Sequence, residues 1–325
     1  MKIKTLAALM AFGLALTGTA RAADNFPTRT LTMVIPFAAG GPTDVLGRIV
    51  AQRMGEILGQ NIIVENVGGA GGMTGSKRVA EARPDGYTMV LGTVGTHAQS
   101  QTLYKHPLYN SMTDFTPVAL IADVPIALLV RKDLPPKNLK EFVDYAKANQ
   151  AKMQFGSAGA GSATHLGCVV LNTAMGTNIT HIPYKGTGPA MQDLVAGRID
   201  FLCEIVSTAK PQIDGGTVRA LAIMTTERSP VLPNLPTAHE QGLDVQAYTW
   251  NAIFLPKAAP AEVVKKLNDA AVAAIDTPAV TQRLQSIGAS VVGPDRRSPD
   301  YLGSFVKSEI EKWAAPIKAS GVVVE

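Results

Sequence analysis

The chain has 325 residues, of which 46% are hydrophobic and 17% charged, and its formal net charge is +4. Lysine and arginine are scattered and only 6% of the residues are aromatic, so the basic patches with interleaved aromatic residues that are typical of nucleic-acid-binding proteins are missing, and we expect no nucleic-acid partner. The first 22 residues carry three basic side chains and no acid, so their removal lowers the net charge from +4 to +1.

The N-terminus has the pattern of a secretory signal peptide. Lys2 and Lys4 precede an apolar run, 6–16, and small residues follow up to Ala22. The run is shorter than the ~20 residues that span a bilayer, and no later run approaches that length. No cysteine lies near the cut site to accept a lipid. We therefore expect cleavage after Ala22 and a mature protein that diffuses freely in the periplasm.

Short β-type runs alternate with helical patterns along the mature chain, which predicts parallel βαβ units and an α/β fold. In chain order the expected elements are strand 31–35, helix 44–58, strand 62–64, helix 73–82, strand 88–91, strand 126–130, helix 139–148, strand 153–155, helix 162–175, strand 198–202, strand 220–224 and a further segment at 248–250. The apolar character of the strands indicates that helices cover both faces of each sheet.

The mature length and two proline-containing stretches predict a division into two lobes. The remaining 303 residues are too many for one small core. Pro125 introduces an apolar strand and marks one candidate crossing, and the Pro-rich stretch 229–236 precedes the other. The expected organisation is a signal peptide at 1–22, a first lobe made of 23–124 and 248–325, and a second lobe made of 125–247.

The first candidate binding loop, 36–44 (PFAAGGPTD), lies between the first strand and the first helix. A Gly-Gly turn that leads into a helix presents backbone N–H groups and the positive end of the helix dipole, which together favour an anion. The loop also follows a strand, where open α/β sheets bind their ligands. A tight βα turn capped by Thr43 or Asp44 explains the same residues equally well.

The second candidate loop, 156–165 (GSAGAGSATH), places three glycines and two serines between a strand and a helix. It offers the same kind of anion site in the other lobe. The loop lacks the third glycine of a dinucleotide fingerprint, no P-loop occurs, and Ser157 and Ser162 do not fit the G-x-S-x-G pattern. We therefore expect no cofactor, and we expect His165 to be a packed or capped helix residue.

Three further segments have weaker signals. The glycine-rich stretch 68–75 could hold a ligand, but we favour a role in close packing and left-handed turns. The segments 93–97 and 184–188 follow strands, so their hydroxyl or N–H groups could complete a pocket. Lys185 could supply a counter-charge or lie in solvent.

The histidines do not indicate a metal site, because no two of them have the spacing of a ligand pair. They are His97, His106, His165, His181 and His239.

Two cysteines, Cys168 and Cys203, occur in a chain that we expect to be exported, where thiols oxidise. One lies in the helix after the serine-containing loop and the other at the end of the strand 198–202. A disulfide that joins helix to sheet is the predicted state, and two separately buried thiols are the alternative.

Six segments together resemble the receptors of tripartite tricarboxylate transporters, the Bug-type extracytoplasmic solute receptors. In chain order they are 36–44, 156–162 with 165–166, 183–186, 194–200, 235–242, and Trp250 shortly before Pro256. Each segment is weak evidence alone, but their common order makes the match specific, and it covers nearly the whole mature chain. Phe37 stands where a tyrosine is common, and His239 interrupts the usual Pro-Thr-x-x-Glu pattern.

The resemblance implies a type II periplasmic-binding-protein fold, with two α/β lobes that close on a ligand like a Venus flytrap and two crossings between them. It also implies that the first loop and the serine-containing loop hold a ligand carboxylate, partly through water, and that a further group of contacts varies with the ligand. The implied ligand-binding residues are Phe37, Ala39, Gly41, Thr43, Asp44, Thr93, Ser157, Ala158, Gly161, Ser162, Tyr184 and Glu204.

The resulting functional hypothesis is a monomeric periplasmic receptor without catalytic residues. It would capture a dicarboxylate, tricarboxylate or aromatic carboxylate and deliver it to integral membrane transporter subunits. A periplasmic enzyme acting on a small carboxylate is the alternative, but neither a serine elbow nor a metal cluster supports it. Asp44 is expected to read a ligand donor directly because Thr43 offers the helix another cap, while capping by Asp44 stays the second possibility.

Overall fold

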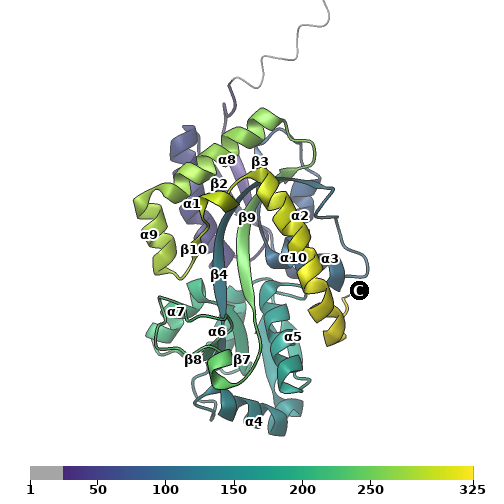
Figure 1. The fold of residues 1–325 in the computed structure, drawn as a ribbon, viewed down its shortest axis with the longest axis vertical. Helices are drawn as coiled ribbons and strands as arrows, with labels where there is room; N and C mark the ends of the chain where they lie inside the picture. The colour runs from purple at the N-terminus through teal and green to yellow at the C-terminus, as the bar shows by residue number, and fades with distance from the viewer. Residues whose placement is uncertain (1–24, 325) are drawn as a thin grey trace, which may run out of the picture.

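A computed structural model describes residues 25–324, and the predicted signal peptide at 1–22 lies outside them. The described part of the chain folds into two α/β lobes (Figure 1). Its strands are β1 (Leu31–Ile35), β2 (Ile62–Asn66), β3 (Thr88–Thr93), β4 (Phe115–Arg131), β5 (Gln154–Ser157), β6 (Thr180–Pro183), β7 (Phe201–Ile205), β8 (Val218–Ile223), β9 (Tyr248–Pro256) and β10 (Ser290–Val291).

Helices precede, connect and follow these strands. They are α1 (Pro42–Leu58), α2 (Met73–Ala80), α3 (Ser100–Leu103), α4 (Leu139–Asn149), α5 (Ala163–Met175), α6 (Thr187–Val195), α7 (Val206–Asp214), α8 (Ala261–Asp276), α9 (Pro278–Ser286) and α10 (Pro299–Ser320). Within residues 25–324, none is both long and apolar enough to cross a membrane.

The sheet order is β2-β1-β3-β9-β4-β7-β5-β6, with β8 and β10 also paired to β4. In the first lobe β1 runs parallel to β2 and β3, and in the second lobe β5 runs parallel to β6 and β7. The long strand β4 joins them, because its residues 115–125 pair with β9 and its residues 126–131 pair with β7 and β8. Figure 1 shows β4 and β9 running between the lobes.

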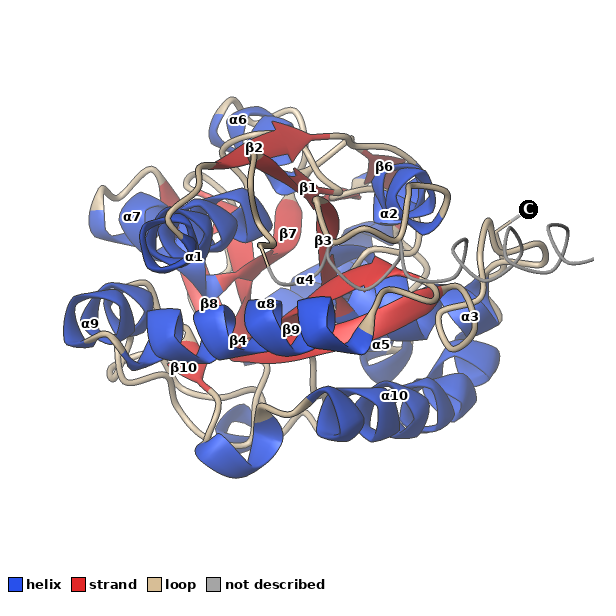
Figure 2. Cartoon of the chain, turned by 90° about the horizontal axis from the view of Figure 1, so that it is seen from above, coloured by secondary structure: helices blue, strands red, loops and turns tan. Residues whose placement is uncertain are grey.

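Helices lie around the strands, as the view from above shows (Figure 2). One hydrophobic core extends from Met33 in β1 through Leu128 in β4 to Phe201 in β7. A second cluster lies under α6 and α7 and includes Leu194 and Val206. Both clusters are built from the apolar strands, as expected for sheets covered by helices. The predicted two-lobed α/β fold is confirmed.

The long C-terminal helix α10 is fixed where β9 begins. Its buried Glu309 accepts hydrogen bonds from the Tyr248 hydroxyl, at 2.6 Å, and from the Trp250 indole N–H, at 3.0 Å. Tyr248 pairs with Pro125 at the point where β4 passes toward the second lobe. A satisfied buried carboxylate of this kind holds its neighbours in a defined arrangement, because losing one partner would leave a charge unpaired.

The bounds of two strands differ from the sequence-based expectations. The strand expected at 198–202 is β7, Phe201–Ile205. It begins later than expected because Gly197 turns the chain after α6 with φ 74°, and the Arg198 N–H still bonds back to the Asp193 carbonyl of that helix. Cys203 is therefore central in β7 and not at its end. The strand expected at 126–130 is the last third of β4, which continues through Pro125 and begins at residue 115.

The start of the first helix also differs from the expectation. The helix begins at Pro42 with Gly41 as its N-cap, and the N-cap makes no side-chain hydrogen bond. Neither Thr43 nor Asp44 is the N-cap. The helix can begin earlier, at Pro42, because proline has a φ suited to the first helical position and no N–H that would need an acceptor.

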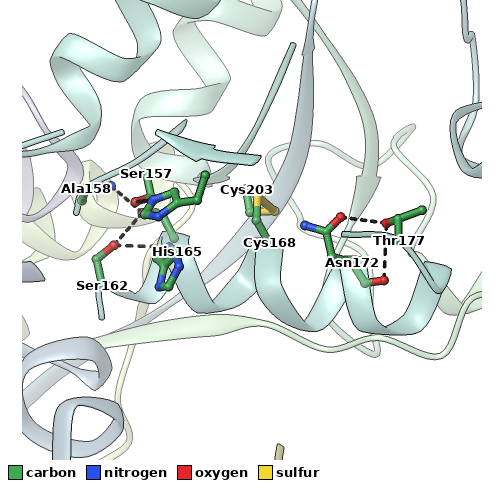
Figure 3. The surroundings of a disulfide bond; sticks show 10 residues. Ser157, Ala158, Ser162, His165, Cys168, Asn172, Thr177 and Cys203 are labelled. Carbon is green, nitrogen blue, oxygen red and sulfur yellow. Dashed lines mark hydrogen bonds between the residues drawn. A yellow bond between two sulfur atoms is a disulfide. The ribbon is translucent and has the colours of Figure 1, made fainter. Parts of the chain in front are cut away.

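The predicted disulfide is present: Cys168 and Cys203 are bonded, with Cα atoms 5.4 Å apart. Figure 3 shows Cys168 on α5 between the loop that holds Ser157 and Ser162 and the far end of the helix. The bond therefore fixes α5 to the central strand β7 close to that loop.

Removing the bond should lower stability mainly by freeing the unfolded chain. The cysteines are 35 residues apart, for which the loop-entropy model gives about 4 kcal/mol. We predict that the Cys168→Ala/Cys203→Ala variant loses about that much unfolding free energy in urea titrations. Wild-type protein unfolded under reducing conditions is the control, because it keeps both side chains. Equal stability of the oxidised and reduced wild-type proteins would contradict the prediction.

Candidate functional site

Three helices from two lobes begin at the same small cavity. α1 of the first lobe contributes its first turn, and α5 and α6 of the second lobe contribute theirs. The cavity has a volume of about 20 Å³, and its lining residues are Phe37, Pro42, Thr43, Thr93, Ala158, Ser162, Ala163, Thr164, Thr187, Ile205 and Thr249. Every residue in this lining is uncharged.

This arrangement favours a negatively charged group. The first N–H groups of a helix have no acceptor within the helix, and the helix dipole puts partial positive charge at the same end. Thr43, Ala163 and Thr187 stand in the first turns of the three helices, and hydroxyl groups surround them. An anion in this cavity would be held by oriented dipoles and hydroxyls rather than by a basic side chain.

The serine-containing loop is shaped by its own hydrogen bonds. Ser162 is the N-cap of α5: its Oγ accepts the His165 N–H at 3.2 Å and donates to the Gly159 carbonyl at 2.7 Å. The Thr164 Oγ1 accepts the Ala158 N–H at 2.9 Å. These bonds, visible in part in Figure 3, fix the loop before any ligand arrives. A fixed loop lowers the entropy lost on binding.

A larger cleft of about 760 Å³ adjoins the cavity. Thr187 lines both, and the cleft is bounded by Ala39 and Gly40 from the first lobe and by Glu204 and Ser207 from the second. The cavity and the cleft therefore lie next to each other at Thr187, and residues of both lobes border the cleft.

Glu204 is fully buried at the wall of this cleft. Its Oε1 accepts hydrogen bonds from the Thr187 and Thr208 hydroxyls, at 3.1 and 2.6 Å. Among residues 25–324, its Oε2 has no hydrogen-bond partner, and the same is true of the Ser207 Oγ. Burial raises the pKa of Glu204 to about 7, although the two threonine hydroxyls and the Ile205 backbone act in the opposite direction. The side chain is thus divided between its neutral and ionised forms near neutral pH.

Asp44 has a different place from the one expected. One carboxylate oxygen accepts the Arg48 Nε–H at 3.0 Å and the Asn66 amide at 2.9 Å, and the other accepts the Gly40 N–H at 3.0 Å. Burial raises the pKa of Asp44, but these three hydrogen bonds outweigh it and hold the pKa below its usual value. The carboxylate is therefore occupied in shaping the Gly40–Gly41 turn and is absent from the cavity lining, and its expected direct contact with a ligand donor stays a prediction.

Of the other residues expected to bind ligand, five line the cavity: Phe37, Thr43, Thr93, Ala158 and Ser162. Ala39 and Glu204 line the larger cleft. Gly41 is the N-cap of α1, with the Thr187 hydroxyl 3.8 Å from where its Cβ would lie.

Three of the expected residues face elsewhere. The Tyr184 hydroxyl donates to Asp193 at 2.7 Å, beside α6. Gly161 packs against the ring of Tyr104. Ser157 is completely buried, and its Oγ lies 2.6 Å from the His181 Nε2.

The contact between Ser157 and His181 resembles a nucleophile and its base, but its surroundings indicate a structural role. The Ser157 Oγ also accepts the Gly159 N–H, at 3.0 Å, so it supports the loop. Burial lowers the pKa of His181 to about 4. The pair is therefore an uncharged hydrogen bond inside the second lobe and is not part of the cavity lining.

Sequence reasoning missed six lining residues. Four of them, Pro42, Ala163, Thr164 and Thr187, lie within segments already selected and could have been found by assigning the first turn of each helix. Ile205 and Thr249 come from β7 and β9, whose positions beside the cavity depend on the sheet order and have no local sequence signal.

The glycine-rich stretch 68–75 is absent from the cavity lining and faces the second lobe, where Gly71 approaches the Ala160 carbonyl. Lys185 is exposed, and its backbone carbonyl accepts the Ala38 N–H at 3.0 Å. In residues 25–324, no three histidine, cysteine or acidic side chains are grouped so that they could hold a metal ion.

Comparison with known proteins gives a consistent result. Residues 46–322 match the model of the family described as tripartite tricarboxylate transporter family receptor. Three solved structures are similar over nearly the whole chain. MatC from Rhodopseudomonas palustris, with bound malate, is 42% identical with a TM-score of 0.88, and the match covers 90% of this chain and 100% of that one.

The other two are equally complete matches. The periplasmic binding protein BugD is 40% identical with a TM-score of 0.89, and the match covers 92% of this chain and 100% of BugD. Rpa4515 from R. palustris, with adipate, is 35% identical with a TM-score of 0.87, and the match covers 92% of this chain and 99% of that one.

The raised pKa of Glu204 should make stability depend on pH. A carboxyl group with a raised folded-state pKa favours the folded state below its unfolded pKa of 4.5, and this advantage is lost as the pH rises through about 7. Glu204→Gln, which stays neutral, should match wild type at the acid end of this window. At about pH 8 it should be more stable by on the order of 3 kcal/mol.

Urea unfolding of both proteins across this pH range measures the difference. Glu311→Gln, at an exposed position on α10, is the control and should follow wild type throughout. A difference between Glu204→Gln and wild type that does not change with pH would show that burial does not raise the pKa of Glu204.

Proposed function

This chain belongs to the family of tripartite tricarboxylate transporter receptors, and from that membership we propose that it is a periplasmic receptor that captures a small dicarboxylate and delivers it to membrane transporter subunits. The observation that carries the proposal is the convergence of three helix N-termini on one cavity between the lobes. A cavity of this kind can hold an anion by hydrogen bonds and helix dipoles, without a covalent or catalytic step.

The two lobes supply complementary parts of this site. We propose that the first lobe comprises 23–124 and 248–325 and the second 125–247, which is supported by the change of pairing partner within β4. Because the cavity of about 20 Å³ has room for only about one water molecule, the lobes must separate for a dicarboxylate to enter. Ligand contacts made only in the closed form would then favour closure.

The proposed ligand class is a short aliphatic dicarboxylate. Two of the similar structures carry malate and adipate, which share two carboxylates on a short chain. In this chain one carboxylate would bind at the helix N-termini and the second would reach into the adjoining cleft. There the neutral form of Glu204 can donate a hydrogen bond from its unpaired Oε2, and Ser207 offers a hydroxyl beside it.

The proposal includes a single chain acting as a monomer. An enzyme that acts on a small carboxylate is the alternative. The close contact between Ser157 and His181 would be its nearest candidate machinery, but Ser157 is completely buried, and neither residue lines the cavity or the cleft. Recovery of an unchanged ligand after long incubation distinguishes the receptor from the enzyme.

Calorimetric titration with malate, succinate, adipate and butyrate tests the proposal. At least one dicarboxylate should bind with a Kd of about 1 μM or below and raise the Tm. Butyrate should bind more weakly than succinate, which differs from it by a second carboxylate. Absence of binding by all the dicarboxylates, or conversion of one of them, would contradict the proposal.

Two substitutions at one cavity position separate binding from folding. Ala163→Asp adds a carboxylate in the first turn of α5, where the helix dipole stabilises it, so the fold should persist while the ligand carboxylate is repelled. We expect a loss of affinity of about 100-fold or more. Ala163→Ser, of similar size and without charge, should retain affinity within about tenfold. Equal binding by both variants would remove this cavity as the carboxylate site.

A further inference from the structure

Atoms from one lobe fill the side-chain positions of glycines in the other, and for all of these glycines except Gly161 they include backbone atoms. We call this contact the glycine seam and define it by seven residues whose absent Cβ points at the opposite lobe: Gly68, Gly71, Gly95, Gly159, Gly161, Gly186 and Gly188. The first three belong to the lobe of β1–β3, and the others belong to the lobe of β5–β8.

Four members of the seam approach the backbone of the other lobe too closely for any side chain: Gly71, whose Cβ would lie 2.0 Å from the Ala160 carbonyl oxygen, and Gly68, Gly95 and Gly186. A Cβ on Gly68 would lie 2.6 Å from the Lys185 carbonyl oxygen, and a Cβ on Gly186 would lie 2.8 Å from the Ala38 nitrogen. A Cβ on Gly95 would lie 2.8 Å from the Ala163 nitrogen. The atoms that they meet are backbone atoms, which cannot rotate away as the end of a flexible side chain can.

Three of these four glycines are not required by their own backbone conformations. Gly186 has an extended φ of 169°, and neither Gly68 nor Gly95 has a φ in the left-handed region. By contrast, Gly71 has a φ of 61°, so its own turn favours glycine. The close approach of the opposite lobe is therefore what excludes alanine at Gly68, Gly95 and Gly186.

The seam lies next to the cavity and includes direct hydrogen bonds. The Ala38 N–H donates to the Lys185 carbonyl at 3.0 Å, and the Tyr104 hydroxyl donates to the Ala160 carbonyl at 2.8 Å. Ala38 follows Phe37, which lines the cavity. The distance between the two loops at the seam thus sets how closely the cavity lining surrounds a bound carboxylate.

We infer that Gly68, Gly95 and Gly186 are positioning residues for ligand capture, because they let the two lobes meet backbone to backbone and so complete the anion site. The inference rests on the proposed function, since it assumes that closure accompanies binding. An alanine at any of the three positions fits the separated lobes but holds the closed lobes apart. Such a variant should therefore fold normally and bind poorly.

The test uses Gly95→Ala and Gly186→Ala, with Gly303→Ala on α10 as control. A Cβ on Gly303 would meet only the Pro117 Cγ, at 3.6 Å, which is ordinary contact within the first lobe. The two seam variants should stay folded, with a Tm close to that of wild type without ligand, because the substitutions leave the hydrophobic core of each lobe unchanged. Their affinity for malate, succinate or adipate, whichever binds wild type, should fall at least about tenfold. The control should bind as wild type does.

A second readout measures closure without relying on affinity. Spin labels on cysteines introduced at the exposed Lys147 of α4 and Lys265 of α8 report the distance between the lobes. In ligand-free protein, the seam variants should populate longer distances than wild type. Adding the dicarboxylate should shorten the distance in wild type and in the control but not in the seam variants.

The outcomes separate the inference from the proposed function. If no dicarboxylate binds wild type, the proposed function fails. The ligand-free distances still test whether the seam glycines let the lobes close. Identical ligand-free distance distributions in the seam variants and wild type would overturn the seam, as would unchanged affinity in both variants. A large fall in Tm for both Gly95→Ala and Gly186→Ala without ligand would also overturn it, because the glycines would then serve the folding of their own lobes.

Discussion

The convergence of three helix N-termini on one uncharged cavity is the constraint on which the rest of the structure depends. The first N–H groups of a helix have no acceptor within the helix, and here the first turns of α1, α5 and α6 all line the same space. Because the helices belong to different lobes, the site is complete only when the lobes meet. Under the proposed function, a bound anion would therefore favour the closed arrangement.

The surrounding structure keeps these helix ends in position. Asp44 fixes the Gly40–Gly41 turn before α1, and Ser162 caps α5. The disulfide holds α5 to the central strand β7 near the serine-containing loop. Where the chain passes between the lobes, Glu309 accepts hydrogen bonds from the Tyr248 hydroxyl and the Trp250 indole of β9. The loops on each lobe are rigid, and the lobes meet at the glycine seam. The main conformational change left to the protein is therefore the motion of one lobe relative to the other.

Much of this architecture could be predicted from the sequence. The alternation of strands and helices, the two glycine-rich loops and the disulfide depend on local patterns, and each is found where such a pattern occurs. The exact ends of strands were harder to predict, because pairing partners decide them. β4 continues through Pro125 because it is held by β9 on one side of that residue and by β7 and β8 on the other.

The orientation of individual side chains was the least predictable part of the site. Ser157, Tyr184 and Asp44 stand in the expected loops, yet each bonds to a partner distant in sequence: His181, Asp193 and Asn66. Thr249 reaches the cavity only because β9 lies in the middle of the sheet. The local sequence indicates which loop lies at the cavity, whereas tertiary contacts determine which side chains of that loop line it.

The most direct test of the central claim is a crystal structure of the protein with the dicarboxylate that binds it most tightly. The account predicts one carboxylate between the first turns of α1 and α5, with oxygens within hydrogen-bonding distance of the N–H groups of Thr43, Ala163 or Thr164. The lobes should be in contact along the glycine seam. A carboxylate held by a lysine or arginine side chain outside this cavity, or a ligand bound to one lobe with the other lobe apart, would contradict the account.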